Sequence, residues 1–200
     1  MGAQGHEEGR AGFPWLWLAP GILVLAGLTV WGIMVYPQLP GRVPQHLGSD
    51  GVDSYAAKSV GSVFVPVFLH AGVLAVMSAT ALLTLRVRPE SELAPGERVS
   101  SLVNRPRTRR GARRAAKAQL FLACCVGMGL AVACTLMWRT DPLGEQGENV
   151  TLPLLLTMLP LLAGTLAVLA TAVLDRRGRG RDRDGQGART GRPAGRKRTG

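Results

Sequence analysis

The chain has 200 residues, of which 46% are hydrophobic and 18% are charged, and it carries a net charge of +11. Its apolar residues are gathered in four long blocks, and the charged residues lie almost entirely between or after these blocks. Uncharged apolar blocks of about 20 residues are typical of membrane spans. The pattern excludes an ordinary soluble domain and predicts an all-α integral membrane protein with four transmembrane helices.

The predicted spans contain no Asp, Glu, Lys or Arg, each of which costs about 2.5–3.5 kcal/mol at the centre of a membrane helix. At roughly 1.5 Å per residue, each span is long enough to cross roughly 30 Å of hydrocarbon. Aromatic residues near both ends of the first span match the belts at the two faces of a bilayer. In chain order the spans are predicted at residues 14–36, 60–85, 118–138 and 150–174, which together form a membrane domain over 14–174.

Lysine and arginine are distributed very unevenly among the connections. Residues 86–117 hold ten of the 24, and the segment from residue 175 to the C-terminus holds another ten. Connections rich in Lys and Arg stay in the cytoplasm, and four spans place both termini on the same side. We therefore predict a multi-pass protein of the cell (plasma) membrane, with residues 1–13 and the tail in the cytoplasm and the loop between helices 1 and 2 outside it.

The two basic segments serve as determinants of topology, and they also suit docking on anionic lipid. The tail, residues 175–200, is rich in Arg and Gly and contains no aromatic residue, so it is predicted to be disordered. Nucleic-acid binding is not expected, because the tail offers no aromatic side chain to stack on bases. The predicted partner is the lipid bilayer itself, with anionic lipid at the basic loop and tail.

Several residues inside the spans have two interpretations. His70 is the only imidazole in a span, and no carboxylate accompanies it, so we expect a neutral histidine bonded to a backbone carbonyl or hydroxyl; the alternative is a functional intramembrane site. Pro66 and Pro160 are predicted to kink their helices for packing, the alternative being the broken helices of a transporter. Small residues at four-residue spacing in the third span are predicted to bring helices close together, within the bundle or between two chains. They are Ala123, Gly127 and Ala131.

The three cysteines are also expected to serve packing, because they lie in one apolar block without a zinc-type spacing. They are Cys124, Cys125 and Cys134. No metal and no cofactor is expected. The sequence contains no phosphate-binding glycine loop, nucleophile elbow or paired-carboxylate motif, and we therefore predict that the protein is not an enzyme.

The loop between the first two spans, residues 36–58, carries the most information about function. Three prolines restrict the backbone to an extended, stiff exit from the first span, and glycines with Ser and Asp then suit a turn. A loop of this composition is predicted to be structured. The prolines are Pro37, Pro40 and Pro44, the turn is expected around Gly48 and Gly51, and the polar residues are His46, Asp50, Asp53 and Lys58.

This loop resembles a bacterial membrane-protein family of unknown function, whose motif reads roughly Tyr-Pro-x-Leu-Pro-x-x-Ile/Val-Pro-x-His. The motif is also found in the N-terminal part of SdpI-type toxin-immunity proteins. The matching positions are Tyr36, Pro37, Leu39, Pro40, Val43, Pro44, His46, Gly51, Asp53, Tyr55 and Lys58. Leu47 departs from the Phe or Trp that usually follows the histidine, and the further spans of the immunity proteins are not found in this sequence.

Three interpretations of the loop remain open. It can be a structural element folded on the outer ends of the helices, with Lys58 or His46 paired to an aspartate. It can recognise an extracellular peptide, toxin or membrane-protein partner. It can also form a hydrolytic or metal site around His46, although catalytic zinc usually has three protein ligands. We predict a non-enzymatic membrane protein acting in envelope sensing or toxin immunity through this loop; the alternatives are a small transporter or channel component and a membrane enzyme at the outer loop.

Overall fold

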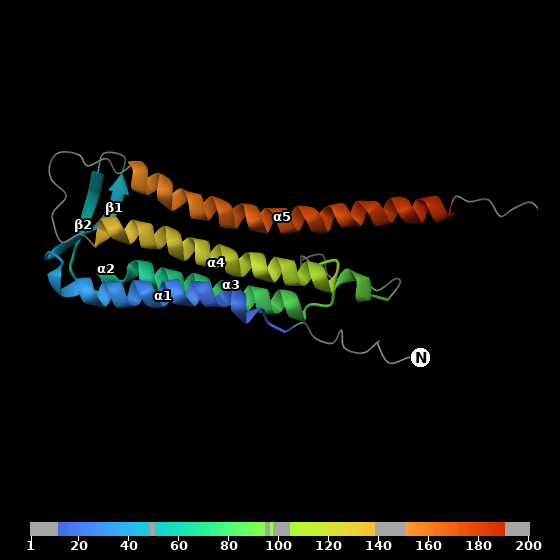
Figure 1. Cartoon of the computed structure of the whole chain (residues 1–200), viewed down its shortest axis with the longest axis horizontal. Coiled ribbons are helices and arrows are strands. Elements are labelled where there is room, and N and C mark those ends of the chain that lie inside the picture. The colour runs from blue at the N-terminus through green and yellow to red at the C-terminus, as the bar shows by residue number, and fades with distance from the viewer. Residues whose placement is uncertain (1–11, 49–50, 95–96, 98–104, 139–150, 191–200) are drawn as a thin grey trace, which may run out of the picture.

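Four long helices form the body of the protein in the computed structural model, which describes residues 12–48, 51–94, 97, 105–138 and 151–190 (Figure 1). Each is long and apolar enough to cross a membrane. The predicted all-α architecture with four membrane-spanning helices is confirmed. The helices are α1 (Trp15–Val35), α3 (Val65–Arg86), α4 (Arg109–Met137) and α5 (Thr151–Thr190).

Shorter elements lie between these helices. A two-stranded antiparallel hairpin occupies the connection from α1 to α3, where the sequence predicted an extended segment and a turn but no strand pairing. The short elements are η1 (Tyr36–Gln38), β1 (Arg42–Gly48), β2 (Gly51–Ala57), α2 (Val60–Val63) and η2 (Glu90–Glu92).

The second span is interrupted near its start. Ser59 caps α2 and forms a reciprocal capping box with Ser62, and the helix ends at Phe64, whose φ of −94° and ψ of 10° are not helical. Pro66 then lies in the first turn of α3, where the missing proline N–H has no intrahelical partner to lose. The sequence predicted a kink at Pro66; the structure has a break at Phe64, two residues earlier, on the side where a proline interrupts a helix.

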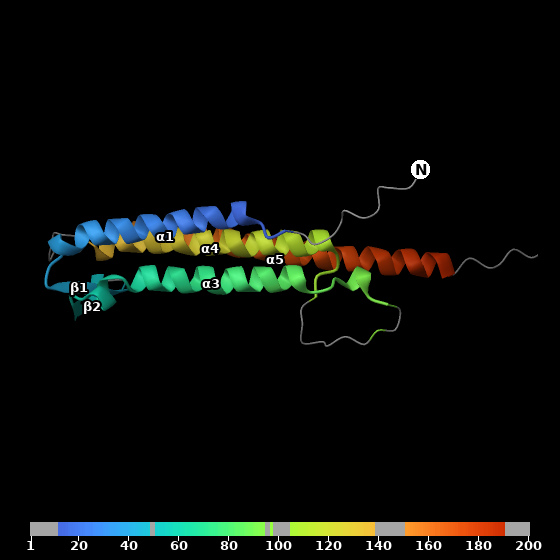
Figure 2. The ribbon, with the colours of Figure 1, turned by 90° about the horizontal axis from the view of Figure 1, so that it is seen from below.

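α4 lies at the centre of the bundle and contacts α1, α3 and α5 (Figures 1 and 2). Alanines on α4 leave room for leucines from α1 and α3. This inner cluster of buried residues is Leu18, Leu74, Ala81, Leu85, Ala112, Ala116, Leu120 and Ala123. The small residues that the sequence analysis singled out in the third span thus pack within the bundle.

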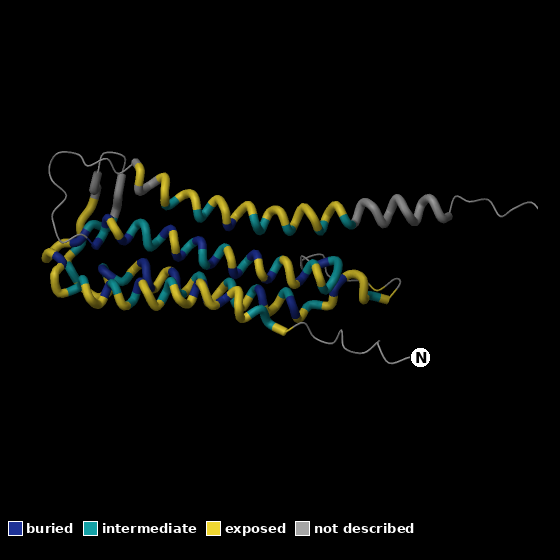
Figure 3. Tube along the Cα trace, in the orientation of Figure 1, coloured by how far each residue is buried: buried dark blue, intermediate teal, exposed yellow. Residues whose placement is uncertain are grey.

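α5 packs chiefly on α4 and exposes most of its surface (Figure 3). The approach is close at two glycines: a Cβ on Gly129 would lie 3.2 Å from the carbonyl oxygen of Thr157, and one on Gly164 would lie 3.0 Å from the Cα of Leu122. The exposed side chains of α5 are mostly leucines, which suits a surface in contact with lipid chains.

α5 extends to Thr190, beyond the predicted end of the fourth span at residue 174. The first part of the tail, which was predicted to be disordered, is therefore helical. Acidic Asp175, Asp182 and Asp184 interleave with arginines in this part of the sequence, a pattern that supports helices through opposite charges three or four residues apart. Residues 191–200 of the tail, residues 1–11 and the connection at 139–150 lie outside the described residues.

The two ends of the bundle differ in composition. One end, which we call the basic end, holds the start of α1, the connection between α3 and α4, and the last part of α5 (Figure 1). The β-hairpin lies at the other, the hairpin end. The described residues of the α3–α4 connection and the first turns of α4 place nine Lys and Arg residues at the basic end. They are Arg86, Arg88, Arg105, Arg107, Arg109, Arg110, Arg113, Arg114 and Lys117.

Candidate functional site

The hairpin joins the end of α1 to the start of α2. Its register pairs Arg42 with Ala57, Pro44 with Tyr55 and His46 with Ser54, and the pairing is irregular on either side of His46. Such an irregularity bends and twists a strand locally. Gly48 and Gly51 face each other at the far end of the hairpin, around the position where the sequence predicted a turn.

Lys58 ties the end of the hairpin to its beginning. Its Nζ donates to the carbonyl oxygens of Leu39, at 2.9 Å, and Pro37, at 3.4 Å, and lies 5.0 Å from the centre of the Tyr36 ring. Its backbone N–H donates to the carbonyl oxygen of Gly41 at 2.9 Å. Hydrogen bonds from a charged donor and a cation–π contact both stabilise such an arrangement. We call this arrangement the Lys58 clamp.

The hairpin is also seated on the helices through apolar contacts. Leu39 and Val43 are 4% and 2% exposed, and they join residues of α1, α3 and α4 in an outer cluster. The Gln45 side chain adds a hydrogen bond from Nε2 to the carbonyl oxygen of Ser62, at 3.2 Å. The buried residues of the outer cluster are Leu28, Leu39, Val43, Val63, Val67, Cys134 and Trp138.

Aromatic rings surround the break between α2 and α3. The Trp138 indole is buried, and its Nε1 donates to the carbonyl oxygen of Val63 at 3.1 Å, so it satisfies a group at the break. Its ring packs edge-on against Trp31, with 5.0 Å between centroids, and Phe64 lies between Trp138 and Tyr36. These rings therefore hold the hairpin end together, whereas Trp15 at the other end of α1 is 70% exposed, as expected of an interfacial belt.

The hairpin lies within the part of the chain that matches a family model, whereas its supports from α4 lie outside that part. Residues 22–69 match the family model described as Domain of unknown function (DUF1648). The matched segment runs from α1 through the hairpin and α2 into α3. It contains every loop residue on which the resemblance to a family of unknown function rested, and it supports that resemblance; the link to SdpI-type immunity proteins stays a prediction. Comparison with curated proteins and with solved structures gives no match.

The structure brings together only some of the predicted loop residues of the matched segment. Tyr36, Pro37, Leu39 and Lys58 meet in the Lys58 clamp. The described partners of Lys58 are two backbone carbonyls; the predicted pairing of Lys58 or His46 with an aspartate stays a prediction, because the side chains of Asp50 and Asp53 are not among those described. Of the remaining residues, Pro40 is exposed, Pro44 is half-buried in β1, and Tyr55 is 49% exposed on β2.

Three further predicted residues have only their backbone described. His46 lies in β1, and Gly51 and Asp53 lie in β2, but their side chains are outside the described part of the structure, and Asp50 is outside it altogether. Among the described residues, no group of three His, Cys, Asp or Glu side chains is placed to hold a metal ion. The metal or hydrolytic interpretation of the loop therefore stays an untested prediction.

His70 is separate from the hairpin and lies within the bundle. It is 0% exposed and its imidazole packs directly on Gly127 of α4, where a Cβ would overlap the ring. Neither ring nitrogen makes a hydrogen bond of good geometry with a described residue, although the backbone of Ala123 is a polar neighbour. The ring of His70 can therefore pack here only because residue 127 has no side chain.

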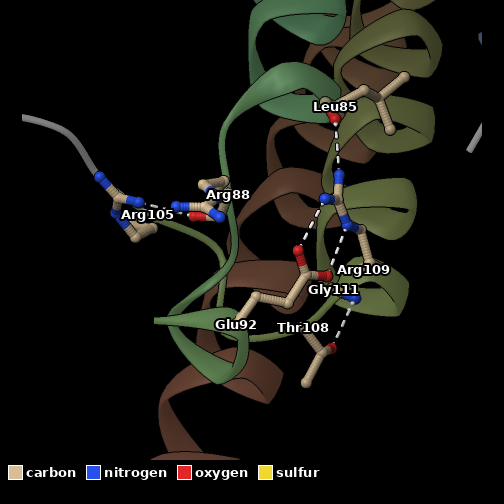
Figure 4. A network of polar contacts seen from close by, with 7 residues as sticks. All are labelled: Leu85, Arg88, Glu92, Arg105, Thr108, Arg109 and Gly111. Atoms are coloured by element: carbon tan, nitrogen blue, oxygen red, sulfur yellow. Dashed lines mark hydrogen bonds and ion pairs between the residues drawn. The ribbon is translucent and has the colours of Figure 1, made fainter. Parts of the chain in front are cut away.

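The basic end is closed by a polar network of its own (Figure 4). Arg109 binds Glu92 with two bonds, Nε to Oε1 at 2.7 Å and Nη2 to Oε2 at 2.8 Å, and its Nη1 reaches the carbonyl oxygen of Leu85 at 3.4 Å. Arg105 donates from Nη1 to the carbonyl oxygen of Arg88 at 2.8 Å. These bonds fold the α3–α4 connection back onto the ends of the two helices.

Sequence reasoning missed several residues that support the hairpin but are not matching positions of the loop motif. Gln45 and Trp138 are two of them, and the Ser59–Ser62 capping box is a third. The capping box had a recognisable signal, because a serine followed three residues later by a second polar residue precedes an apolar run. Trp138 had none, because it lies 75 residues from its partner Val63 in the sequence.

Proposed function

We propose that this multi-pass membrane protein is not an enzyme, and that its hairpin binds an extended peptide outside the cytoplasm, in envelope sensing or in immunity to a peptide toxin. The observation that carries the proposal is the seating of the hairpin. Its base is fixed to three helices by the Lys58 clamp, by the outer cluster and by Trp138. Its strands run across the hairpin end, transverse to the helix axes (Figure 1).

The orientation of the bundle supports an outer location for the hairpin. The described arginines of the α3–α4 connection, and the arginines and Lys117 in the first turns of α4, lie at the basic end, opposite the hairpin. Since Lys- and Arg-rich connections stay in the cytoplasm, the hairpin end faces the outside when the protein sits in the cell membrane. Both termini are then cytoplasmic.

The hairpin offers the kind of surface that an extended peptide uses. Within the described residues each strand is paired only with the other, so both strands have a second edge with backbone donors and acceptors. An extended peptide can pair with such an edge and place its side chains beside the strand. Tyr55 on β2 is half exposed, so its ring is available to contact a peptide that pairs with the free edge of β2. A rigid base lowers the entropy cost of binding, because the edge is already in position.

The interior of the bundle gives less support to the transporter alternative. His70 is completely buried against Gly127, and the ring fills the space between α3 and α4. A transport path through this histidine would need water to reach it. We therefore place the function at the hairpin and assign His70 to helix packing.

Membrane-impermeant maleimide labelling of intact cells tests the orientation. In a background with the three native cysteines replaced by alanine, Gln38→Cys at the hairpin end is expected to react from outside. Arg88→Cys at the basic end is expected to react only after the membrane is opened. Both positions are exposed. Labelling of Arg88→Cys, but not Gln38→Cys, in intact cells would refute the outer hairpin.

Survival under peptide-toxin challenge tests the function. A sensitive strain producing the protein is exposed to a panel of membrane-active peptide toxins and compared with strains producing His46→Ala and Tyr55→Ala variants. Val60→Ala is the matched control, because Val60 is exposed beside the hairpin but outside its strands. We expect protection by the unaltered protein and the control, and loss of protection in the two hairpin variants. Equal survival of all four strains, with equal protein levels, would count against the proposal.

A further inference from the structure

A groove at the basic end lies among three helices. α4 forms its floor with Arg114, Lys117, Ala118 and Phe121, while Trp17 of α1 and Ala167 and Thr171 of α5 form its walls. Its volume is about 390 Å³. The groove exists because α5 packs on α4 without closing against α1 at this level.

The mouth of the groove is cationic. Arg114 and Lys117 are three residues apart on α4, so both side chains lie on the same face of the helix. Both are exposed, and the Lys117 Nζ lies 5.6 Å from the centre of the Trp17 ring. Among the described residues, no carboxylate lines this groove; Asp175 lines the two neighbouring cavities, one of which Arg114 also borders. The described lining of the groove therefore gives its two cations no counter-charge.

The other residues of α4 that line the groove are apolar and lie further along the helix than the two cations. Ala118 and Phe121 follow the two cations along α4, and Ala167 faces them from α5. Lys117 directly precedes the uncharged stretch of α4, so the cations stand at the level where headgroups meet acyl chains. Trp17, which is 42% exposed, is an aromatic of the kind found at that level.

We propose that this groove binds one anionic phospholipid, with the phosphate between Arg114 and Lys117 and an acyl chain along Ala118, Phe121 and Ala167. The polarity gradient selects this occupant. A soluble anion would leave the apolar part of the groove unfilled, and a zwitterionic lipid would leave the two cations partly unneutralised. The lipid fills the space between α1 and α5 and joins α5 to the rest of the bundle.

Native mass spectrometry of the intact, delipidated protein titrated with phosphatidylglycerol tests the site. We expect one lipid to bind preferentially, and Arg114→Gln/Lys117→Gln to weaken its binding at least about tenfold. Arg110→Gln/Arg113→Gln is the matched control, since it removes the same charge from neighbouring positions of α4 outside the groove. Ala167→Trp fills the apolar part while keeping both cations, and it is expected to weaken binding as well.

Three results would overturn the proposal. Equal weakening by the control pair would show that basic charge on α4 attracts lipid without a specific site. Undiminished binding to Ala167→Trp would show that no acyl chain enters the groove. Displacement of the lipid by an equal concentration of inorganic phosphate would show that the cations bind phosphate alone. If the glutamine pair does not fold, the comparison of Ala167→Trp with the unaltered protein still decides the matter.

Discussion

Each end of the bundle is closed by one long cationic side chain, and the two closures differ in chemistry. At the hairpin end, Lys58 binds two backbone carbonyls and an aromatic ring beside a buried cluster. At the basic end, Arg109 binds Glu92 through a two-bonded ion pair whose side chains are 38% and 39% exposed. The partners of Lys58 are part of the backbone and cannot turn away, whereas Glu92 is a side chain in water.

This difference indicates that the two ends respond differently to their surroundings. Exposed ion pairs are screened by salt and contribute little to stability, while half-buried bonds and packed rings are insensitive to salt. We therefore expect the hairpin end to keep a single conformation. At the basic end the exposed arginines remain accessible to headgroups and solvent.

Removing Trp138 breaks the hairpin end and carries the largest expected effect. Trp138→Ala leaves a cavity under Phe64 and Trp31 and an unpaired carbonyl at Val63. The free energy of unfolding should fall by about 3–5 kcal/mol. Titration with SDS in detergent micelles measures it. Trp15→Ala, at a 70% exposed position on α1, should change the same quantity by less than about 0.5 kcal/mol. Similar losses for the two tryptophans would contradict the role of Trp138 in holding the hairpin end together.

The substitution Gly127→Ala tests the packing of α3 against α4 in the middle of the bundle, between its two ends. In Gly127→Ala the new Cβ would lie 2.9 Å from the Nδ1 of His70 and closer still to other ring atoms, so the helices must separate. Overpacking of this kind costs about 1–3 kcal/mol or more. Gly72→Ala is the control, because a Cβ there meets nothing within 4 Å. A stable Gly127→Ala protein would show that His70 has room to move.

Replacing Lys58 by methionine tests the clamp while keeping a long side chain. Two carbonyls lose their charged donor, and the stability should fall by about 1–3 kcal/mol. Limited proteolysis should then cut the hairpin first, because its base is released. Arg42→Met, at an exposed position of β1, is the control and should leave both measurements unchanged. Equal protease sensitivity of the two variants would show that the Lys58 clamp does not hold the base of the hairpin.

The smallest effect is expected for the ion pair at the basic end. Its dependence on salt concentration distinguishes this end from the hairpin end. A double-mutant cycle on Arg109→Ala and Glu92→Ala should give a weak coupling that falls as sodium chloride is raised. The loss caused by Lys58→Met should not depend on salt. A coupling between Arg109 and Glu92 that persists at molar salt would contradict the distinction between the two ends.

The four helices could be predicted from the sequence because membrane spans need only length and the absence of charge. Their ends were predicted less well. α4 begins at Arg109, before the predicted 118, because Thr108 caps it and the alanines that follow favour helix despite the arginines between them. α5 likewise continues past residue 174. Hydropathy locates the membrane, whereas capping and propensity decide where a helix stops.

The candidate site could be predicted only in part. The loop motif contains Tyr36, Leu39 and Lys58, which meet in the Lys58 clamp; their role in function stays a prediction. It did not predict that Lys58 binds carbonyls, because backbone acceptors have no signature in a sequence. The sequence placed an interruption at Pro66 but did not predict that the helix would end at Phe64 and that Trp138 would bind the carbonyl of Val63 there.

The position of α5 has a consequence for how the protein is made. Both strands, the Lys58 clamp and Trp138 all come from residues that precede 139. The described contacts that seat the hairpin are thus all encoded in the nascent chain before α5 leaves the ribosome. Insertion of α5 then adds a fourth helix beside α4, so an error at this last step would leave the Lys58 clamp and the Trp138 contacts intact.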